Sequence, residues 1–366
     1  MTGGQVVSGE RVPTGEQQAR MPRVPPTLRL RLGPARWTVR RRSLVIGAAA
    51  FAASLALLVV ALGSGTFPVA PADVVAVLLG RSDDPLLQTV VGEWRMPRAL
   101  GALGVGALLG IAGALFQTVT RNPLASPDIL GLSSGAFTGM LAALVLVSTS
   151  WPVLVAGSLV GALATAAAIW LLAYRGGVQG FRLIVVGIGV SAMLASLNTW
   201  MLLQIELETA MFASAWGAGS LNGVTAAPVA GALACALPFV AAAFALVPRL
   251  RQIELGDDLA AATGARPNLV RTVALLVGVV LVAAATTVGG PIAFVALAAP
   301  QVGRLLARTP SLSLGLSALI GATLLLASDL VAQHLLPVPL PVGVVTVSIG
   351  GAYLVLMIVL EVRRRV

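Results

Sequence analysis

Chemically reactive side chains are scarce in this chain of 366 residues. Cys235 is the single cysteine and His334 the single histidine, so we expect no disulfide within the chain and no metal site. All 24 basic residues are arginine. A phosphate-cradling P-loop needs a lysine, so the chain itself is not expected to hydrolyse ATP. Nor does the sequence offer the paired acids or the serine and base of an intramembrane hydrolase.

Two arginines, Arg95 and Arg98, stand in "RMPR" directly before a long apolar run. A guanidinium group stays charged and can fork onto carboxylates. One interpretation of the pair is that both side chains snorkel from the end of a membrane span to lipid phosphates.

An ion-coupled transporter usually keeps an acidic residue near the middle of the membrane. Aspartate and glutamate occur in the expected tails and loops, apart from Asp329 near the end of an apolar run. This distribution argues against a secondary transporter that is driven by an ion gradient.

The composition indicates the elements that must position these groups. The chain is 57% hydrophobic and only 10% charged, whereas soluble domains carry about 25% charged residues. Continuous apolar stretches of about 20 residues predict an all-α polytopic membrane protein. We expect ten transmembrane helices, at 43–63, 98–118, 129–149, 152–173, 183–204, 227–247, 272–288, 291–307, 312–333 and 341–361.

The arginines set the expected orientation. With ten spans and both termini cytoplasmic, 21 of the 24 arginines fall on the cytoplasmic side, and only Arg81, Arg95 and Arg98 fall outside. Cytoplasmic segments of membrane proteins carry such an excess of positive charge. We therefore interpret the net charge of +10 as a signal of topology in a protein that contacts membrane lipid. We expect no nucleic-acid partner.

Three parts of the chain follow from this topology. Residues 1–42, rich in proline, glycine and arginine, are expected to form a disordered basic cytoplasmic tail. Residues 43–362 form the transmembrane domain, and 363–366 are a basic cytoplasmic end. Outer loops are expected at 64–94, with a short helix in "PADVVAVLLG", and at 205–223.

The cytoplasmic segment 249–271 is longer than a simple connector needs to be. Acidic residues begin "IELGDDLAAATG", Gly264 ends it, and Pro267 suits the start of a second helix. We interpret this segment as a docking surface for a cytoplasmic partner.

Four motifs occur in order along the chain. They are "RMPRALGALGVGALLGIAGALFQTVTRNPLASPDILGLSSGA" at 95–136, "ELGDDLAAATGA" at 254–265, "GGPIAFVALAAPQVGRLL" at 289–306 and "LPVGVVTVSIGG" at 340–351. Through them, the chain from about residue 43 to 362 resembles the FecCD-like permeases, the transmembrane subunits of type II ABC importers for iron-siderophores, haem and cobalamin.

The resemblance implies a permease and not an enzyme. It implies a second permease subunit, identical or unlike, two cytoplasmic ATPase subunits that bind ATP and Mg, and an extracytoplasmic solute-binding protein. The complex would lie in a bacterial cytoplasmic membrane, and this chain would hold no cofactor. A ferric siderophore is the expected substrate, with cobalamin and haem as open alternatives.

The resemblance also implies roles for particular residues. The docking pair for the binding protein would be Arg95 and Arg98. The residues against the ATPase would be Gly256, Asp257, Leu259, Ala260, Gly264 and Arg266. The pathway would be lined by Ser191, Ser196, Asn198 and Thr199, although small polar residues also pack helices in lipid. A structural inner turn would be formed by Asn122, Pro123 and Pro127.

The chain departs from the family pattern at three places. Gln301 stands where histidine is frequent, and Gly351-Ala352-Tyr353 stands where Ala-Pro-Phe is common. Gln333 stands where some relatives carry a further outer arginine. The departure at Gln333 leads to the hypothesis that the second permease subunit is an unlike chain.

Overall fold

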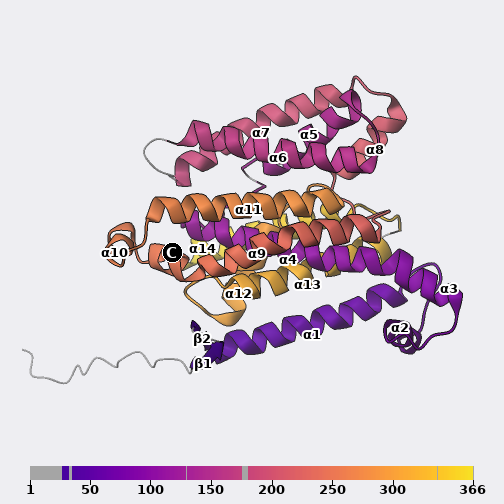
Figure 1. The fold of residues 1–366 in the computed structure, drawn as a ribbon, viewed down its shortest axis with the longest axis horizontal. Coiled ribbons are helices and arrows are strands. Elements are labelled where there is room, and N and C mark those ends of the chain that lie inside the picture. Colours follow the sequence, from indigo (N-terminus) through magenta and orange to yellow (C-terminus); the bar gives the residue numbers. More distant parts are fainter. Residues whose placement is uncertain (1–26, 33–34, 129, 175–179, 336, 366) are drawn as a thin grey trace, which may run out of the picture. The chain divides into compact units, whose positions relative to one another are not determined.

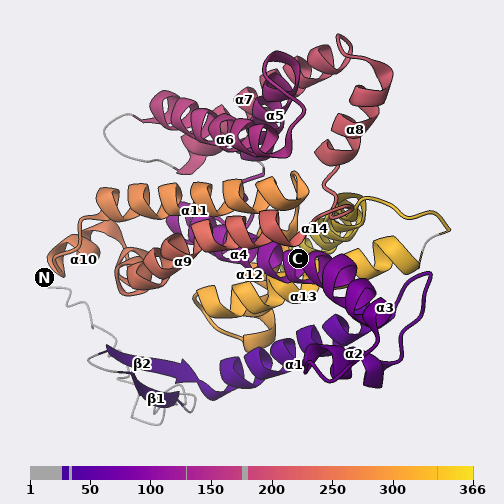
Figure 2. The ribbon, with the colours of Figure 1, turned by 45° about the vertical axis from the view of Figure 1, so that its right-hand side comes forward.

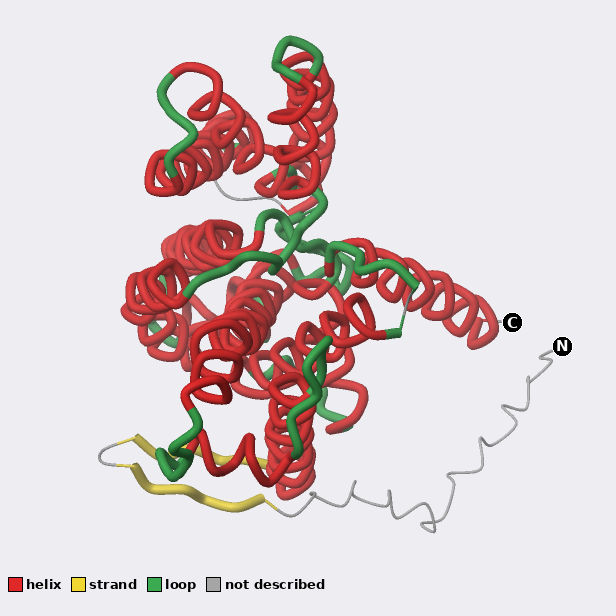
Figure 3. Tube along the Cα trace, turned by 90° about the vertical axis from the view of Figure 1, so that its right-hand side faces the viewer, coloured by secondary structure: helices red, strands yellow, loops and turns green. Residues whose placement is uncertain are grey.

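The computed structural model describes residues 27–32, 35–128, 130–174, 180–335 and 337–365. Contacts divide the chain into a unit that ends at Arg41 and a unit from Arg42 onward. In the first, β1 (Thr27–Leu32) and β2 (Ala35–Arg40) pair as an antiparallel hairpin, the strands seen in Figure 3.

The hairpin lies within residues 1–42, the segment that was expected to form a disordered basic tail. "TLRLRL" alternates leucine and arginine with the period of a strand, a local signal that the composition of the whole tail concealed. Residues 1–26 lie outside the described residues.

Helices connected by loops make up the second unit, which has no strand among its described residues, as Figures 1 and 2 show. Its elements are α1 (Arg41–Gly63), α2 (Pro71–Leu78), α3 (Pro85–Leu87), the π-helical η1 (Gln88–Arg95), α4 (Met96–Thr120), α5 (Leu132–Leu146), α6 (Trp151–Ala173), α7 (Gly180–Leu202), α8 (Leu207–Gly217), α9 (Ala226–Glu254), α10 (Asp257–Ala262), α11 (Pro267–Gly289), α12 (Val295–Ala307), α13 (Leu314–His334) and α14 (Val342–Arg365).

Each of the ten expected spans coincides with one of these helices. Among the described residues, seven helical stretches are long and apolar enough to cross a membrane, which makes the chain a multi-pass membrane protein. The apolar stretches of α5, α12 and α14 are shorter, at Leu132–Leu146, Val295–Ala307 and Val342–Leu356. The count of ten spans and the orientation of the termini therefore stay predictions.

Two loops are more helical than expected. The outer stretch 64–94 contains α2, as predicted, but its last part is α3 and η1, which run directly into α4. On the other side, α9 extends to Glu254 and α11 begins at Pro267. Only residues 255–266, with α10 among them, remain between these two long helices.

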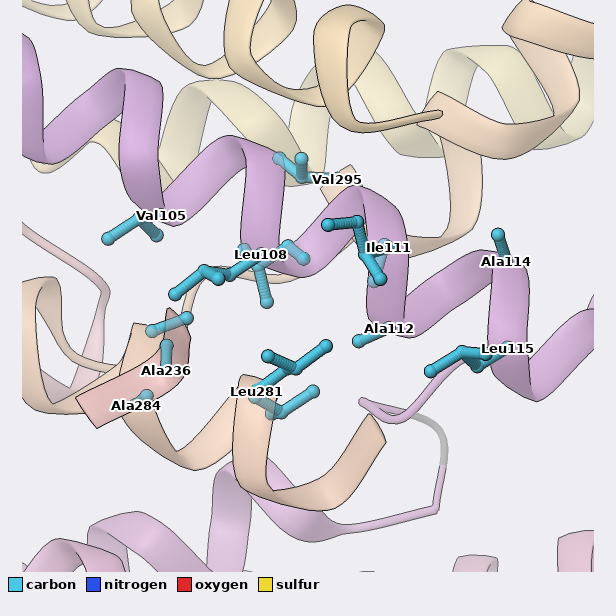
Figure 4. Packing of buried hydrophobic residues seen from close by; sticks show 14 of the residues in the cluster. Val105, Leu108, Ile111, Ala112, Ala114, Leu115, Ala236, Leu281, Ala284 and Val295 are labelled. Carbon is cyan, nitrogen blue, oxygen red and sulfur yellow. The ribbon is translucent and has the colours of Figure 1, made fainter. Parts of the chain in front are cut away.

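Helix α4 lies at the centre of the second unit and contacts α9, α11, α12 and α13. Figure 4 shows Val105, Leu108 and Ile111 of α4 gathered with Leu281 of α11 and Val295 of α12. Helices α5, α6 and α7 pack on one another, and α11 contacts both α5 and α6.

Glycines let α4 approach its neighbours at backbone distance. A Cβ atom built on Gly106 would lie 2.3 Å from the carbonyl oxygen of Gly321, and one on Gly110 would lie 2.1 Å from that of Ser317. On Gly113 it would lie 1.7 Å from the carbonyl oxygen of Ala296. Such contacts of small residues replace the hydrophobic effect as the force that joins helices in lipid.

We predict that Gly113→Ala destabilises the protein strongly, because the methyl group meets a backbone atom that cannot move alone. Overpacking typically costs about 1–3 kcal/mol, and we expect a loss at or above that upper end. Gly231→Ala in α9 is the matched control, since a Cβ there has nothing within 4 Å. Thermal unfolding of both variants in detergent tests this, and equal melting temperatures would contradict it.

Candidate functional site

Two clusters of polar side chains lie at the opposite ends of α4. Arg95 and Arg98 stand at its start and Arg121 directly after its end. At 1.5 Å per residue, the 25 residues of α4 separate these ends by about 37 Å. We refer to the two sides of the bundle as the Arg98 end and the Arg121 end.

Arg98 forms a forked ion pair with Asp329 of α13. Its Nε and Nη2 atoms donate to Oδ2 and Oδ1 of Asp329 at 2.8 and 2.7 Å. Its Nη1 atom donates to Oδ1 of Asn222 at 2.7 Å, and Gln333 Nε2 donates to the same oxygen at 3.2 Å. The Asp329 side chain is only 6% exposed and that of Arg98 22%, so this bidentate pair is shielded from water.

Arg95 binds backbone carbonyl groups at and after the end of α1. Its Nη1 atom donates to the carbonyl oxygen of Leu62 at 2.7 Å, and Nη2 donates to that of Phe67 at 2.6 Å. Carbonyl groups at the end of a helix lack partners within it, and a cation satisfies them well. Both arginines of the predicted docking pair thus have partners within the chain.

At the Arg121 end, Asp257 in the first turn of α10 bonds to Arg121 at the end of α4 and to Arg271 of α11. Arg121 Nη2 donates to its Oδ1 atom at 2.7 Å and also to the carbonyl oxygen of Ile253 in α9. Arg271 of α11 donates from Nη1 to Oδ2 at 2.9 Å and from Nη2 to Oδ1. We call Arg121, Asp257 and Arg271 the Asp257 clamp.

The Asp257 clamp lowers the pKa of the Asp257 carboxyl group. Hydrogen bonds and charge from Arg271, with a smaller contribution from Arg121, hold the pKa of Asp257 below its ordinary value of 3.8, although slight burial opposes them. Arg121 reaches this position with a left-handed backbone, φ 51°, as the residue that ends α4. The sequence indicated Asp257 as a surface contact but gave no sign of its two arginine partners.

The other residues predicted to face the ATPase surround α10. Gly256 and Gly264, on either side of it, have positive φ angles of 115° and 82° that favour glycine. Leu259 and Arg266 are exposed, whereas Ala260 is buried at 1%. Leu255, exposed at 68% beside Leu259, adds apolar surface that the sequence reasoning missed.

A cavity of about 580 Å³ lies towards the Arg98 end between α5, α7, α14 and the segment that leads to α12. Its polar lining comes from Ser133, Ser134, Asn198, Thr199 and Ser348. Of the four predicted pathway residues, Asn198 and Thr199 line this cavity. Ser191 and Ser196 do not, among the described residues.

All four residues form hydrogen bonds within the helical unit. Ser191 Oγ lies 3.3 Å from Ser134 Oγ, in the packing of α7 on α5. Ser196 and Thr199 donate to carbonyl groups of their own helix. Asn198 accepts a bond from Thr138 at 2.6 Å and donates to the Ser134 carbonyl oxygen at 3.2 Å.

The turn after α4 carries Asn122, Pro123 and Pro127. Asn122 Oδ1 accepts the N–H of Leu124 at 2.9 Å, a local bond typical of asparagine in turns. The chain then passes Asp128 and reaches Gly131, where a Cβ atom would lie 3.0 Å from Cβ of Ser191. Because Ser191 is at the midpoint of α7, the turn re-enters the bundle. Asp128, one of the acids that the sequence assigned to loops, thus lies beside the starts of α5 and α12.

The FecCD transport family matches residues 53–360, nearly the whole helical unit. The chain belongs to this family. The match includes both polar clusters, the cavity and the Asp257 clamp, so these features lie within the FecCD region and not in an added segment.

Curated relatives agree along most of their length. The ferric enterobactin transport system permease protein of Escherichia coli is 47% identical over 306 residues, which cover 83% of this chain and 92% of the relative. A protein of Bacillus subtilis described as a probable siderophore transport system permease protein is 33% identical over 314 residues, which cover 83% of this chain and 91% of the relative.

The fold has a close counterpart among solved structures. A transporter assigned to the metal-chelate type of ABC transporters, in an inward-facing conformation, superposes with a TM-score of 0.76 at 25% identity. The alignment covers 86% of this FecCD chain and 99% of that one.

We predict that Asp257→Asn lowers stability at neutral pH and that this loss disappears in acid. A carboxyl group with a lowered pKa in the folded state stabilises the fold above its unfolded-state pKa. The contribution is lost as the pH falls through the folded-state pKa, below about 4. Thermal unfolding of wild type and variant between pH 7 and pH 3 tests this.

Asp258→Asn is the matched control for this experiment, because Asp258 is the next residue of α10 and is also exposed. It should leave the melting temperature unchanged across the same range. A difference between Asp257→Asn and wild type that stays constant down to pH 3 would contradict the assignment.

A double-mutant cycle tests the pair of Arg98 and Asp329. Arg98→Gln and Asp329→Asn should each destabilise by about 1.5–3 kcal/mol, since each leaves a shielded charge without its partner. The double variant should lose less than the sum of the two single losses. Additive losses in chemical or thermal unfolding would show that the two charges do not act as a pair.

Proposed function

We propose that this chain is the transmembrane permease subunit of an ATP-driven importer and forms the pathway for a ferric siderophore that a solute-binding protein delivers. The 47% identity to the ferric enterobactin permease protein, over 83% of the chain, carries this proposal. The second relative, also a siderophore permease protein, supports the same substrate class.

The proposed orientation places the Arg121 end in the cytoplasm and the Arg98 end outside, in the cytoplasmic membrane of a bacterium. The arginine distribution supports it, because the clamp and the basic tail then lie on the positive side. Two ATPase subunits, which hold ATP and Mg, would contact α10 and the exposed Leu255 and Leu259. A second permease subunit, identical or unlike, would complete the pathway.

The Asp257 clamp gives the proposed route for coupling. A displacement of α10 by the ATPase pulls on Asp257, whose carboxylate is bonded to Arg121 at the end of α4 and to Arg271 in α11. Since α4 contacts α12 and α13 at backbone distance, a shift of α4 moves them with it. The cavity between α5, α7 and α14 would change its opening in response.

Uptake measurements test the substrate. A strain that lacks this gene should lose uptake of an iron-55-labelled siderophore, and the plasmid-borne gene should restore it. Labelled cobalamin and haem are measured in parallel. Loss of cobalamin or haem uptake with normal iron uptake would replace the siderophore as the proposed substrate. Uptake that stops when the ion gradient is removed, but continues when ATP is depleted, would contradict the proposal of an ATP-driven importer.

Docking at the Arg98 end is a separate prediction. Arg95→Glu should weaken binding of the solute-binding protein to the purified transporter at least tenfold at low salt, because a favourable charge becomes a repulsive one. Arg81→Glu is the control for outer charge, as an exposed arginine beyond α2. Surface plasmon resonance measures both, and equal weakening would mean that only overall charge matters.

A further inference from the structure

Asp128 lies where two short helices begin. Its Oδ1 atom accepts a hydrogen bond from Ser133 Oγ at 2.9 Å, in the first turn of α5. Its Oδ2 atom accepts one from Ser126 Oγ at 3.1 Å and one from the backbone N–H of Phe294 at 3.2 Å. Phe294 directly precedes α12, so this single carboxylate connects the starts of α5 and α12.

Both helices are too short to cross a membrane from these starting points. With 15 and 13 residues, α5 and α12 span about 22 and 20 Å, against an apolar thickness of about 30 Å. Gly131, which precedes α5, packs against Ser191 at the midpoint of α7. The starts of α5 and α12 therefore lie inside the helical bundle and not at its Arg121 end, although the chain approaches them through a turn.

The surroundings suit a fixed carboxylate. The N-terminal ends of α5 and α12 carry partial positive charge, which stabilises an anion placed between them. Phe294 has a φ of 67°, a left-handed conformation that a residue with a bulky side chain rarely adopts. The bond from its N–H to Asp128 helps to hold this strained residue in place.

On the side of the Arg121 end, the cavity ends close to Asp128 and its partners. On α5 its lining begins at Ser133, on α7 at Ala195, and on α14 it extends no further than Ser348. Ala293, the residue before Phe294, lines it as well. Ser133 thus lines the cavity and also bonds to Asp128. The Asp128 carboxylate therefore lies just outside the cavity, at its boundary towards the Arg121 end.

We propose that Asp128 is a positioning residue of the transport pathway, which ties the start of α5 to the start of α12 and keeps the cavity closed towards the Arg121 end. Passage of a substrate then requires these bonds to break, so that the two helix starts separate. The inference rests on the proposed function, because it assigns a closed state to the pathway of a permease.

Cysteine labelling tests the closure without any substrate. The complete transporter is placed in inside-out membrane vesicles, with Cys235→Ser as background and Ser348→Cys as the reporter above the closure. A membrane-impermeant maleimide is added without ATP. We expect Asp128→Ala to raise the labelling rate at least tenfold over the parent, and Asp128→Asn to raise it less, because its amide oxygen still accepts from one donor.

Ser196→Ala is the control, since its hydroxyl bonds only within α7 in the described structure. Unchanged labelling in an Asp128→Ala complex that assembles normally would overturn the proposal. If that variant does not assemble, unchanged labelling in Asp128→Asn overturns it. Because no siderophore is used, the result is independent of the substrate, and a failed uptake assay with increased labelling would reject the substrate while the closure stands.

Discussion

Backbone contact between α4 and its neighbours is the constraint on which the other features of the helical unit depend. Gly106 and Gly110 place α4 against α13, and Gly113 places it against α12. Lipid gives helices no hydrophobic reason to associate, so shape and close approach must hold them. The result is a tightly packed centre whose two ends carry the polar clusters.

Several polar groups of the helical unit bond to partners from distant parts of the chain, whereas Oε1 of the buried Gln301 has no hydrogen-bond partner among the described residues. Arg98 uses Asp329 and Asn222, and the buried Gln301 donates to Gln117, which itself donates to the Leu297 carbonyl oxygen. In an apolar medium an unpaired group is expensive, so such bonds specify which helices lie together. Gln301, a departure from the family pattern, is accommodated here by a neighbouring amide.

The sequence predicted the positions of the long helices well because apolar length is a local signal. It also located α10, since Gly256, Asp257 and Gly264 mark the ends of a short helix. It could not give the partners of Asp257 or Arg98, because the bonds join residues up to 231 positions apart. Asp128 was placed in a loop for the same reason: no local pattern shows that a turn folds back between helices.

The pairing of Arg98 with Asp329 has a consequence for biosynthesis. The two residues are 231 positions apart, so at about 5–20 residues per second Arg98 waits roughly ten to fifty seconds for its partner. During that time α4 must remain in or near the translocation machinery, or hold its arginine at the lipid surface. Insertion of the C-terminal helices then completes the site, which makes the second unit cooperative in assembly as well as in structure.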